Sequence, residues 1–266
     1  DLSLGLFALV PPSETLDHLI RYLSTWSGSE YLTSVQVIQY AAKLLIPILH
    51  LRARLQHRAG FRKEPISTAA PALNKLASTV SDARMLWRIW GLLPIFQWLI
   101  SLERSPPPTR RLLTIERAQG WSMLAYYPME HLYYLLSHEI IPSSISLPFS
   151  RSSSSPFWAL YVVLQFAHLR EDRALLLRRE RVLSKEKVKG QEHAELERRW
   201  DAWWNELAVN VGYLPLTVHW YEEHCIYLSI PRFNIIWVSI FGFAAAIASF
   251  RSGWKATAVL PLSPPP

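Results

Sequence analysis

An uncharged run of 18 residues, Phe233–Phe250, lies between two arginines near the end of the chain. A helix needs about 20 apolar residues to cross the hydrocarbon core of a bilayer, so this run is at the lower limit for a transmembrane helix. Gly242 and Ala246, four residues apart, give it a face of small side chains suited to close helix packing. The sequence therefore predicts a C-terminal membrane anchor. Arg251 and Lys255, which follow it, favour a cytosolic C-terminal tail.

The rest of the sequence favours helix over strand. Only 9 of its 266 residues are Gly, and it has no Asn-Gly or Asp-Gly pair, so tight hairpin turns are poorly supported. Apolar residues recur instead at helical spacing near residues 13–26, 31–57, 110–141 and 157–189. Thr109 is placed to cap the third of these helices, Pro128 to interrupt it, and Gly190 to end the fourth. We predict an all-α fold: a membrane-associated helical bundle with amphipathic helices and a C-terminal transmembrane helix.

Prolines and serines mark one internal linker. Residues 142–156 begin and end with Pro and contain four consecutive serines, a composition typical of a loop. We therefore predict an N-terminal helical region, 1–141, this linker, and a C-terminal helical region, 157–266. In the last region, charges of both signs are mixed from Arg170 to Arg199, which indicates a solvated pair of helices beside the membrane anchor.

The segment Leu73–Trp90 is the most informative about function. Its apolar residues are three and four positions apart, which places them on a single stripe of a helix. The stripe comprises Leu73, Leu76, Val80, Ala83, Trp87 and Trp90. Lys75 is on the polar face, whereas Arg84 and Arg88 are near the edge of the stripe, where long cationic side chains could reach lipid phosphates.

Two interpretations of this stripe stand on equal terms. An apolar stripe is more often the core face of a soluble bundle than a membrane-binding face. The tryptophans at its end and the neighbouring cations, however, suit the headgroup level of a bilayer. The stripe also leads into Leu92–Ile100, which, like Phe157–Leu169, is uncharged but too short to cross a bilayer alone. These features make an interfacial membrane helix the alternative to a core helix.

The formal charge of +7 suits either an anionic lipid surface or nucleic acid. The basic residues are scattered among acidic ones and lie beside membrane-like segments, so a nucleic-acid partner fits worst. Cys225 is the only cysteine, which excludes an intramolecular disulfide and indicates a buried structural thiol.

Catalytic sequence motifs are missing. The chain has no Walker loop, no G-x-G-x-x-G, no G-x-S-x-G and no H-E-x-x-H. The best polar cluster holds His219 and His224 with two glutamates between them, but a separation of five misses the spacing of a helical two-histidine metal site. Two Glu-His pairs, Glu130-His131 and His138-Glu139, also lack metal-ligand spacing. We predict a protein that is not an enzyme and that uses no metal or cofactor.

Several tracts carry a family resemblance. They are LDHLIRYLS at Leu16–Ser24, QYAAKLL at Gln39–Leu45, KLASTVSDAR at Lys75–Arg84, LWRIWG at Leu86–Gly91, QGWSMLAYYP at Gln119–Pro128, and Ala208–Trp220. Together these tracts resemble the peroxin-11 family of peroxisomal membrane proteins, and the last two look like its fungal C-type branch.

The resemblance implies a protein of the peroxisomal membrane that promotes peroxisome proliferation. Family members insert an amphipathic helix into one leaflet, elongate the membrane, self-associate, and help to assemble the dynamin-related fission machinery with its adaptors. Carried over, the remodelling helix falls on Leu73–Trp90, and Lys75, Arg84 and Arg88 would attract anionic lipids.

Two alternatives remain beside this wedge function. One is a pore-forming channel for small metabolites, which would need several spans where the sequence offers one good span and two short ones. The other is a scaffold whose charged region, Arg170–Arg199, docks fission factors.

Overall fold

A computed structural model describes residues 29–142, 155–186, 190–222 and 235–256, and all regular structure in these residues is helical. The elements are α3 (Ser29–Arg58), α4 (Ala69–Trp87), the 3-10 helix η1 (Arg88–Gly91), α5 (Leu92–Arg104), α6 (Arg110–Ser137), α7 (Ser155–Glu186), α8 (Gln191–Glu222) and α9 (Ile235–Ala256). The predicted all-α class is confirmed. The helix predicted near residues 13–26 lies outside the described residues.

Local sequence signals account for several helix ends. The Thr109 side chain accepts a hydrogen bond from the Leu112 backbone N–H at 3.2 Å, which caps α6 as predicted. Gly190, with a φ of +108°, precedes α8, as predicted for the break after α7. The interruption predicted at Pro128 is wrong, because α6 continues through it. A proline removes only one hydrogen bond of the helix, and packing of α6 against α5 and α7 holds the rest of this long helix together.

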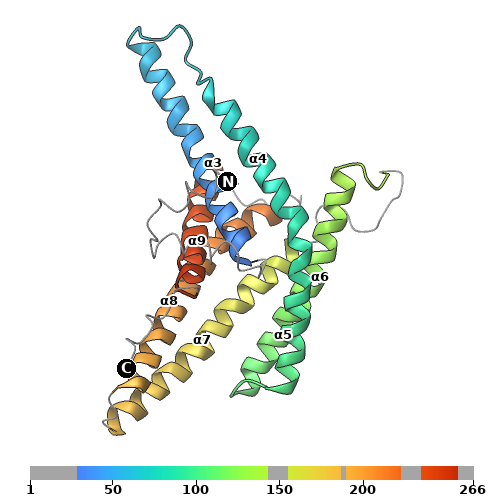
Figure 1. Ribbon diagram of the computed structural model, residues 1–266, viewed down its shortest axis with the longest axis vertical. Helices are drawn as coiled ribbons and strands as arrows, with labels where there is room; N and C mark the ends of the chain where they lie inside the picture. Colours follow the sequence, from blue (N-terminus) through green and yellow to red (C-terminus); the bar gives the residue numbers. More distant parts are fainter. Residues whose placement is uncertain (1–28, 143–154, 187–189, 223–234, 257–266) are drawn as a thin grey trace, which may run out of the picture.

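The helices form an elongated bundle (Figure 1). Helices α3 and α4 make an antiparallel hairpin, here called the arm, that projects from the rest of the molecule. Helix α4 continues through η1 into α5, and the chain then turns back into α6. Helices α7 and α8 form a second antiparallel pair at the other end, and α9 packs against both α8 and α3.

Buried positions recur every seven residues along α7 and α8. They are Val162, Leu169, Leu176 and Leu183 on α7, and Leu196, Trp203, Asn210 and Thr217 on α8. Such a repeat keeps one seam of each helix facing its partner, as in a coiled coil. The Trp203 indole N–H also donates to the Leu169 carbonyl at 2.8 Å, which fixes the register of the pair.

The two regions predicted on either side of the linker pack directly on each other. Helix α3 contacts α9, and α6 contacts α7, so the interior is shared between them. Most of the predicted linker, 142–156, lies outside the described residues, and the domain division stays a prediction.

The interior of the bundle is rich in small and polar residues, while many large apolar side chains lie outside. Buried small residues include Ala42 and Ala53 on α3 and Ala70 and Ala77 on α4, whose helices pack together. Buried polar residues include Gln36, Gln39, Gln119, Ser122, Gln165, Asn210 and Thr217. Small and polar interfaces with apolar exteriors are typical of helices packed within a membrane.

Three helical segments in the described chain are long and apolar enough to cross a membrane: Ser34–Arg58, Ala69–Arg104 and Ile236–Lys255. The last agrees with the predicted anchor. Leu92–Ile100 was expected to be too short to cross a bilayer alone. The structure corrects this, because the run is continuous with α4 in a 36-residue helical segment. Ser34–Arg58 was missed because Lys43 interrupts its apolar run. Phe157–Leu169 leads into the charged part of α7 and is not one of the three.

Candidate membrane-binding surface

The apolar stripe, which runs along α4 and ends at Trp90 in η1, lies on the outside of the bundle. Leu76, Trp87 and Trp90 are 46%, 47% and 56% exposed, Ala83 is exposed, and Leu73 and Val80 are half-buried. Helix α4 packs on α3 through other residues, including the buried Ala70 and Ala77, about a quarter turn away from the stripe. The stripe is therefore not the face by which α4 joins the fold.

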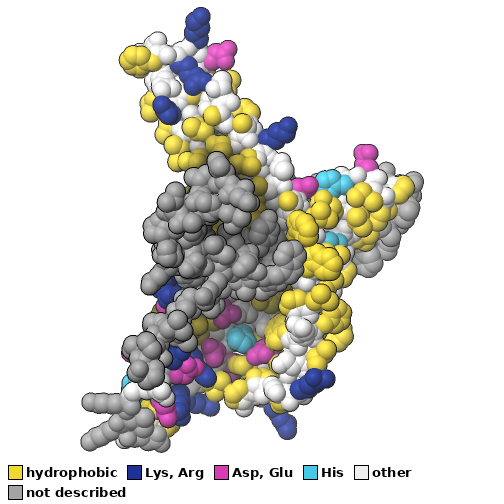
Figure 2. Space-filling view, in the orientation of Figure 1, with side chains coloured by type: hydrophobic (Ala, Val, Ile, Leu, Met, Phe, Trp, Pro, Cys, Tyr) yellow, Lys and Arg dark blue, Asp and Glu magenta, His cyan; other side chains and the backbone are white. Residues whose placement is uncertain are grey.

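The exposed apolar surface continues beyond α4. Ile89 of η1 and Leu93, Phe96 and Ile100 of α5 are exposed, whereas Ile95 and Leu102 on the other side of α5 are buried. Helix α3 adds Ile38, Leu45, Ile48, Leu51 and Leu55. Figure 2 shows apolar side chains along the arm and over α4–α6. An apolar surface of this extent is rare on a soluble monomer and marks a membrane or a partner interface.

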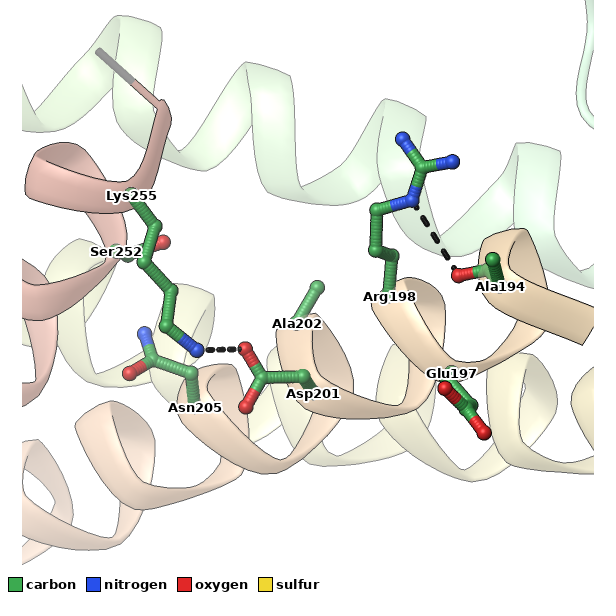
Figure 3. Close-up of a pocket in the computed structure, with 8 residues that line it drawn as sticks. All are labelled: Ala194, Glu197, Arg198, Asp201, Ala202, Asn205, Ser252 and Lys255. Atoms are coloured by element: carbon green, nitrogen blue, oxygen red, sulfur yellow. Dashed lines mark hydrogen bonds and ion pairs between the residues drawn. The ribbon is translucent and has the colours of Figure 1, made fainter. Parts of the chain in front are cut away.

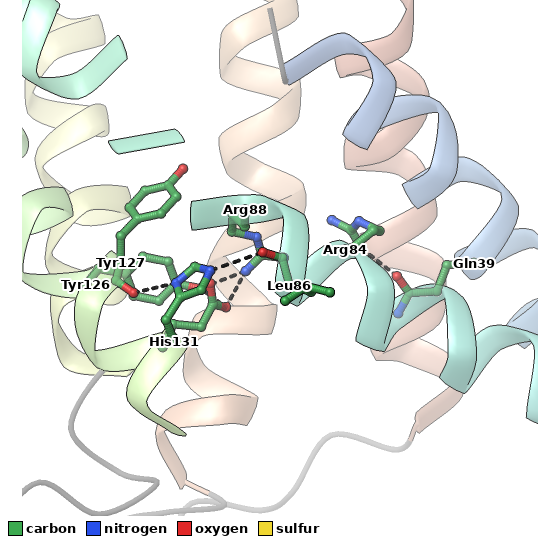
Figure 4. A network of polar contacts seen from close by, with 8 residues as sticks. Gln39, Arg84, Leu86, Arg88, Tyr126, Tyr127 and His131 are labelled. Atoms are coloured by element: carbon green, nitrogen blue, oxygen red, sulfur yellow. Dashed lines mark hydrogen bonds and ion pairs between the residues drawn. The ribbon is translucent and has the colours of Figure 1, made fainter. Parts of the chain in front are cut away.

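Of the three cations expected to meet lipid, only Lys75 lies on the surface. The Arg84 guanidinium donates to the Gln39 side chain at 2.5 Å, and Arg88 is ion-paired with Glu130 (Figure 4). We expected Arg84 and Arg88 to lie beside lipid phosphates, and the structure corrects this. Both guanidinium groups bind side chains of the protein instead. Arg84 follows Ala77 by seven residues, so it shares the buried seam of α4 rather than the edge of the stripe.

A polar clamp, formed by Arg88, Tyr126, Glu130 and His131, joins the end of α4 to α6 (Figure 4). Arg88 donates to the Tyr126 hydroxyl at 2.9 Å, and that hydroxyl donates to Glu130 at 2.5 Å. Burial, together with the nearby Glu130 carboxylate, raises the pKa of the Tyr126 phenol well above its usual value, so it stays protonated and donating. The two ring nitrogens of His131 lie 2.8 Å from the Tyr127 carbonyl and 3.4 Å from the Leu86 carbonyl.

Sequence reasoning missed the partners in this clamp. It singled out Glu130-His131 only as a polar pair without metal spacing, and the structure places both residues against the end of α4. Glu130 follows Tyr126 by four residues on an aromatic-rich helix, which was the one local signal of a shared face. In the second Glu-His pair of the sequence, His138 also contacts α4: its ring nitrogen lies 2.8 Å from the Asp82 carboxylate.

The interior holds a further cluster of polar side chains between α6 and α7. Gln119 bonds to Gln165, Ser122 donates to the Phe157 carbonyl at 2.5 Å, and His168 lies 3.2 Å from Glu116. Within the described residues no three His, Cys, Asp or Glu side chains come close enough to hold a metal ion. His224 and Cys225 lie outside the described residues.

The face of α9 that carries small side chains packs against α3. A β-carbon at Gly242 would overlap the Tyr40 ring, and Ala246 is fully buried in the same cluster. At the end of α9, Arg251 and Lys255 both bind Asp201 of α8, beside an open pocket between the two helices (Figure 3). The hydrogen bond from Lys255, with help from Arg251, lowers the pKa of Asp201. These cations thus tie the end of the anchor to α8.

Comparison with protein families finds one match over most of the chain. The family described as peroxisomal biogenesis factor 11 (PEX11) matches residues 16–254. No curated protein and no solved structure matches the chain.

Proposed function

This chain belongs to the PEX11 family of peroxisomal biogenesis factors, and from that premise we propose that it elongates the peroxisomal membrane with the outer stripe of α4. The family match confirms the resemblance and makes the chain a peroxisomal membrane protein. Its place in the fungal C-type branch stays a prediction.

The observation that supports the wedge is the outward position of Leu76, Trp87 and Trp90, while α4 is held to the fold by the neighbouring face that carries Ala70 and Ala77. The stripe can enter a leaflet without α4 leaving the bundle. Apolar side chains that enter the cytosolic leaflet expand it relative to the opposite leaflet, which generates curvature. Lys75 is exposed and is the cation we propose to meet anionic headgroups beside the stripe.

The same proposal covers orientation and partners. The ion pairs of Arg251 and Lys255 with Asp201 place the end of α9 beside α8, and we propose that this side, with the C-terminal tail, faces the cytosol. There the charged parts of α7 and α8, within Arg170–Arg199, would be available to the dynamin-related fission machinery and its adaptors. We also propose that the chain self-associates in the membrane.

Replacing Leu76 and Trp87 with Asp tests the wedge. Both side chains are about half exposed, so the fold should tolerate the change. An aspartate costs roughly 3 kcal/mol at the centre of a membrane helix and less at the interface. Half of that cost, incurred twice, is about 3 kcal/mol and predicts about a hundredfold loss of tubulation, since 1.4 kcal/mol is a factor of ten. The measurement is the fraction of anionic vesicles tubulated by the reconstituted full chain.

The matched control adds the same two charges to the polar face of α4, as Asn74→Asp with Ser78→Asp. Both positions are exposed and outside the stripe, so tubulation should persist. If the stripe variant tubulates vesicles as well as the unchanged chain does, the wedge is wrong.

A metabolite pore is the second candidate function, favoured by the three candidate spans and the polar interior of the bundle. Purified chain in a planar bilayer tests it. The wedge alone predicts no unitary conductance above that of a protein-free bilayer, whereas stable conductance steps would establish the pore.

A further inference from the structure

The free end of the arm concentrates positive charge. Between Leu51 and Thr68 the chain has five cations and one acid, Glu64. The cations are Arg52, Arg54, Arg58, Arg62 and Lys63, here called the arm tip. Figure 1 places this end of the hairpin far from the rest of the molecule, and Figure 2 shows it as a cluster of basic side chains.

Within the described residues none of the five tip cations is paired with an acidic side chain. Arg88, Arg117, Arg179 and Lys255 each pair with an acidic side chain. Within the described residues the only polar side-chain contact of a tip cation is that of Arg62, whose guanidinium lies 3.4 Å from the Thr68 hydroxyl. Arg52, Arg54, Arg58 and Lys63 are exposed. The tip therefore presents charge that the fold itself does not neutralise.

Apolar side chains border the tip directly. Ile48 and Leu51 are exposed on α3 just before the tip, Leu55 is exposed among its cations, and Phe61 and Ile66 are exposed in the loop. A nucleic acid would meet the cations but leave these side chains in water. A bilayer accommodates both, because its hydrocarbon receives the aliphatic sides while its phosphates receive the cations at the boundary.

We propose that the arm tip is a docking site for the headgroups of anionic phospholipids, with the aliphatic sides of the arm in the adjoining hydrocarbon. The site is separate from the stripe of α4. The proposal rests on the chain acting at a membrane, as proposed above, but not on the wedge.

The test places a probe at the tip of the full chain. Cys225→Ser removes the native thiol, and Ala59→Cys, at an exposed position, carries a fluorophore. The chain is reconstituted into phosphatidylcholine vesicles with or without phosphatidylserine, each containing a lipid with a quencher on its headgroup. We expect several-fold stronger quenching with phosphatidylserine, weakening as salt is raised. A fluorophore at Ser184→Cys, exposed on α7, should show no such difference.

Charge variants identify the residues responsible. Arg52→Gln, Arg54→Gln, Arg58→Gln and Lys63→Gln combined should reduce the quenching to its level in phosphatidylcholine, whereas Lys in place of the three arginines should retain it. The control neutralises four exposed cations of α7, Arg173, Arg178, Arg181 and Lys185, and should retain it too. The proposal is wrong if quenching is the same with and without phosphatidylserine, or if the Gln variant is quenched as strongly as the unchanged chain. Release of the tip by inorganic phosphate at matched ionic strength would also overturn it, because that would indicate a site for free anions.

The stripe and the tip can fail independently. Leu76→Asp with Trp87→Asp should abolish tubulation and leave the tip signal intact. If tubulation persists in that variant while tip quenching depends on phosphatidylserine, the wedge is wrong and the docking site stands. If the tip signal is insensitive to lipid charge while tubulation needs the stripe, the docking site is wrong and the wedge stands.

Discussion

Replacing Arg88 with Met should lower the stability of the chain by about 3 kcal/mol, because it leaves the Glu130 carboxylate buried without its cation. The Glu130 side chain is only 9% exposed, and one of its oxygens already has no hydrogen-bond partner. For a chain of this size the loss corresponds to a fall in the midpoint of thermal unfolding of roughly 6 to 12 °C. Circular dichroism of the purified chain in detergent measures it.

A surface ion pair provides the control. Arg117 binds Glu103 through two hydrogen bonds of 2.6 and 2.7 Å, but both side chains are about half exposed. Arg117→Met should therefore change the midpoint of thermal unfolding very little. Adding Glu130→Gln to Arg88→Met should recover much of the loss, because a neutral amide can still accept from Tyr126. Equal losses for Arg88→Met and Arg117→Met would show that the clamp is no more than a surface contact.

Gly242→Leu should separate α9 from α3. A β-carbon at Gly242 already overlaps the Tyr40 ring, and Tyr40 is itself buried in the cluster with Leu216, Val238 and Ala246. Overpacking a close contact of this kind costs about 1 to 3 kcal/mol, and we expect the upper end because the ring has little room to move. The measurement is thermal unfolding in detergent, combined with the rate of limited proteolysis of the arm.

Ala244→Leu adds the same side chain to an exposed position of α9 and should have little effect. A size exchange, Gly242→Leu with Tyr40→Ala, should restore part of the stability, since the leucine then takes up space vacated by the ring. If Gly242→Leu behaves like Ala244→Leu, the close approach of α9 to α3 is not what holds them together.

The fold class could be predicted because helix depends on local patterns. Recurrence of apolar side chains three and four residues apart, few glycines, and a capping Thr109 are all visible in the sequence, and the structure has the corresponding helices. The continuity of the segment Ala69–Arg104 could not be predicted, because no residue signals that η1 joins α4 to α5 without a turn.

The site was predicted in part, for a physical reason. Periodicity finds the most hydrophobic face of a helix, and on α4 that face is the outer stripe. The face that packs on α3 includes Ala70, Ala77 and Arg84, which do not form an apolar stripe that periodicity would detect. Where lipid replaces water as the outer solvent, apolar periodicity no longer identifies the interior. The pairing of Arg88 with Glu130 joins residues 42 positions apart and becomes visible only in three dimensions.

Because the seam between α7 and α8 repeats every seven residues, the length of this helix pair can change by whole repeats without altering its packing. Loss or gain of seven residues in each helix would leave the same side chains facing one another and change the reach of the pair by about 10 Å. A change of one or two residues would instead rotate the seam away from its partner. Evolution can therefore lengthen or shorten this projection in whole repeats while α3, α4 and α5 keep their sequence and their contacts.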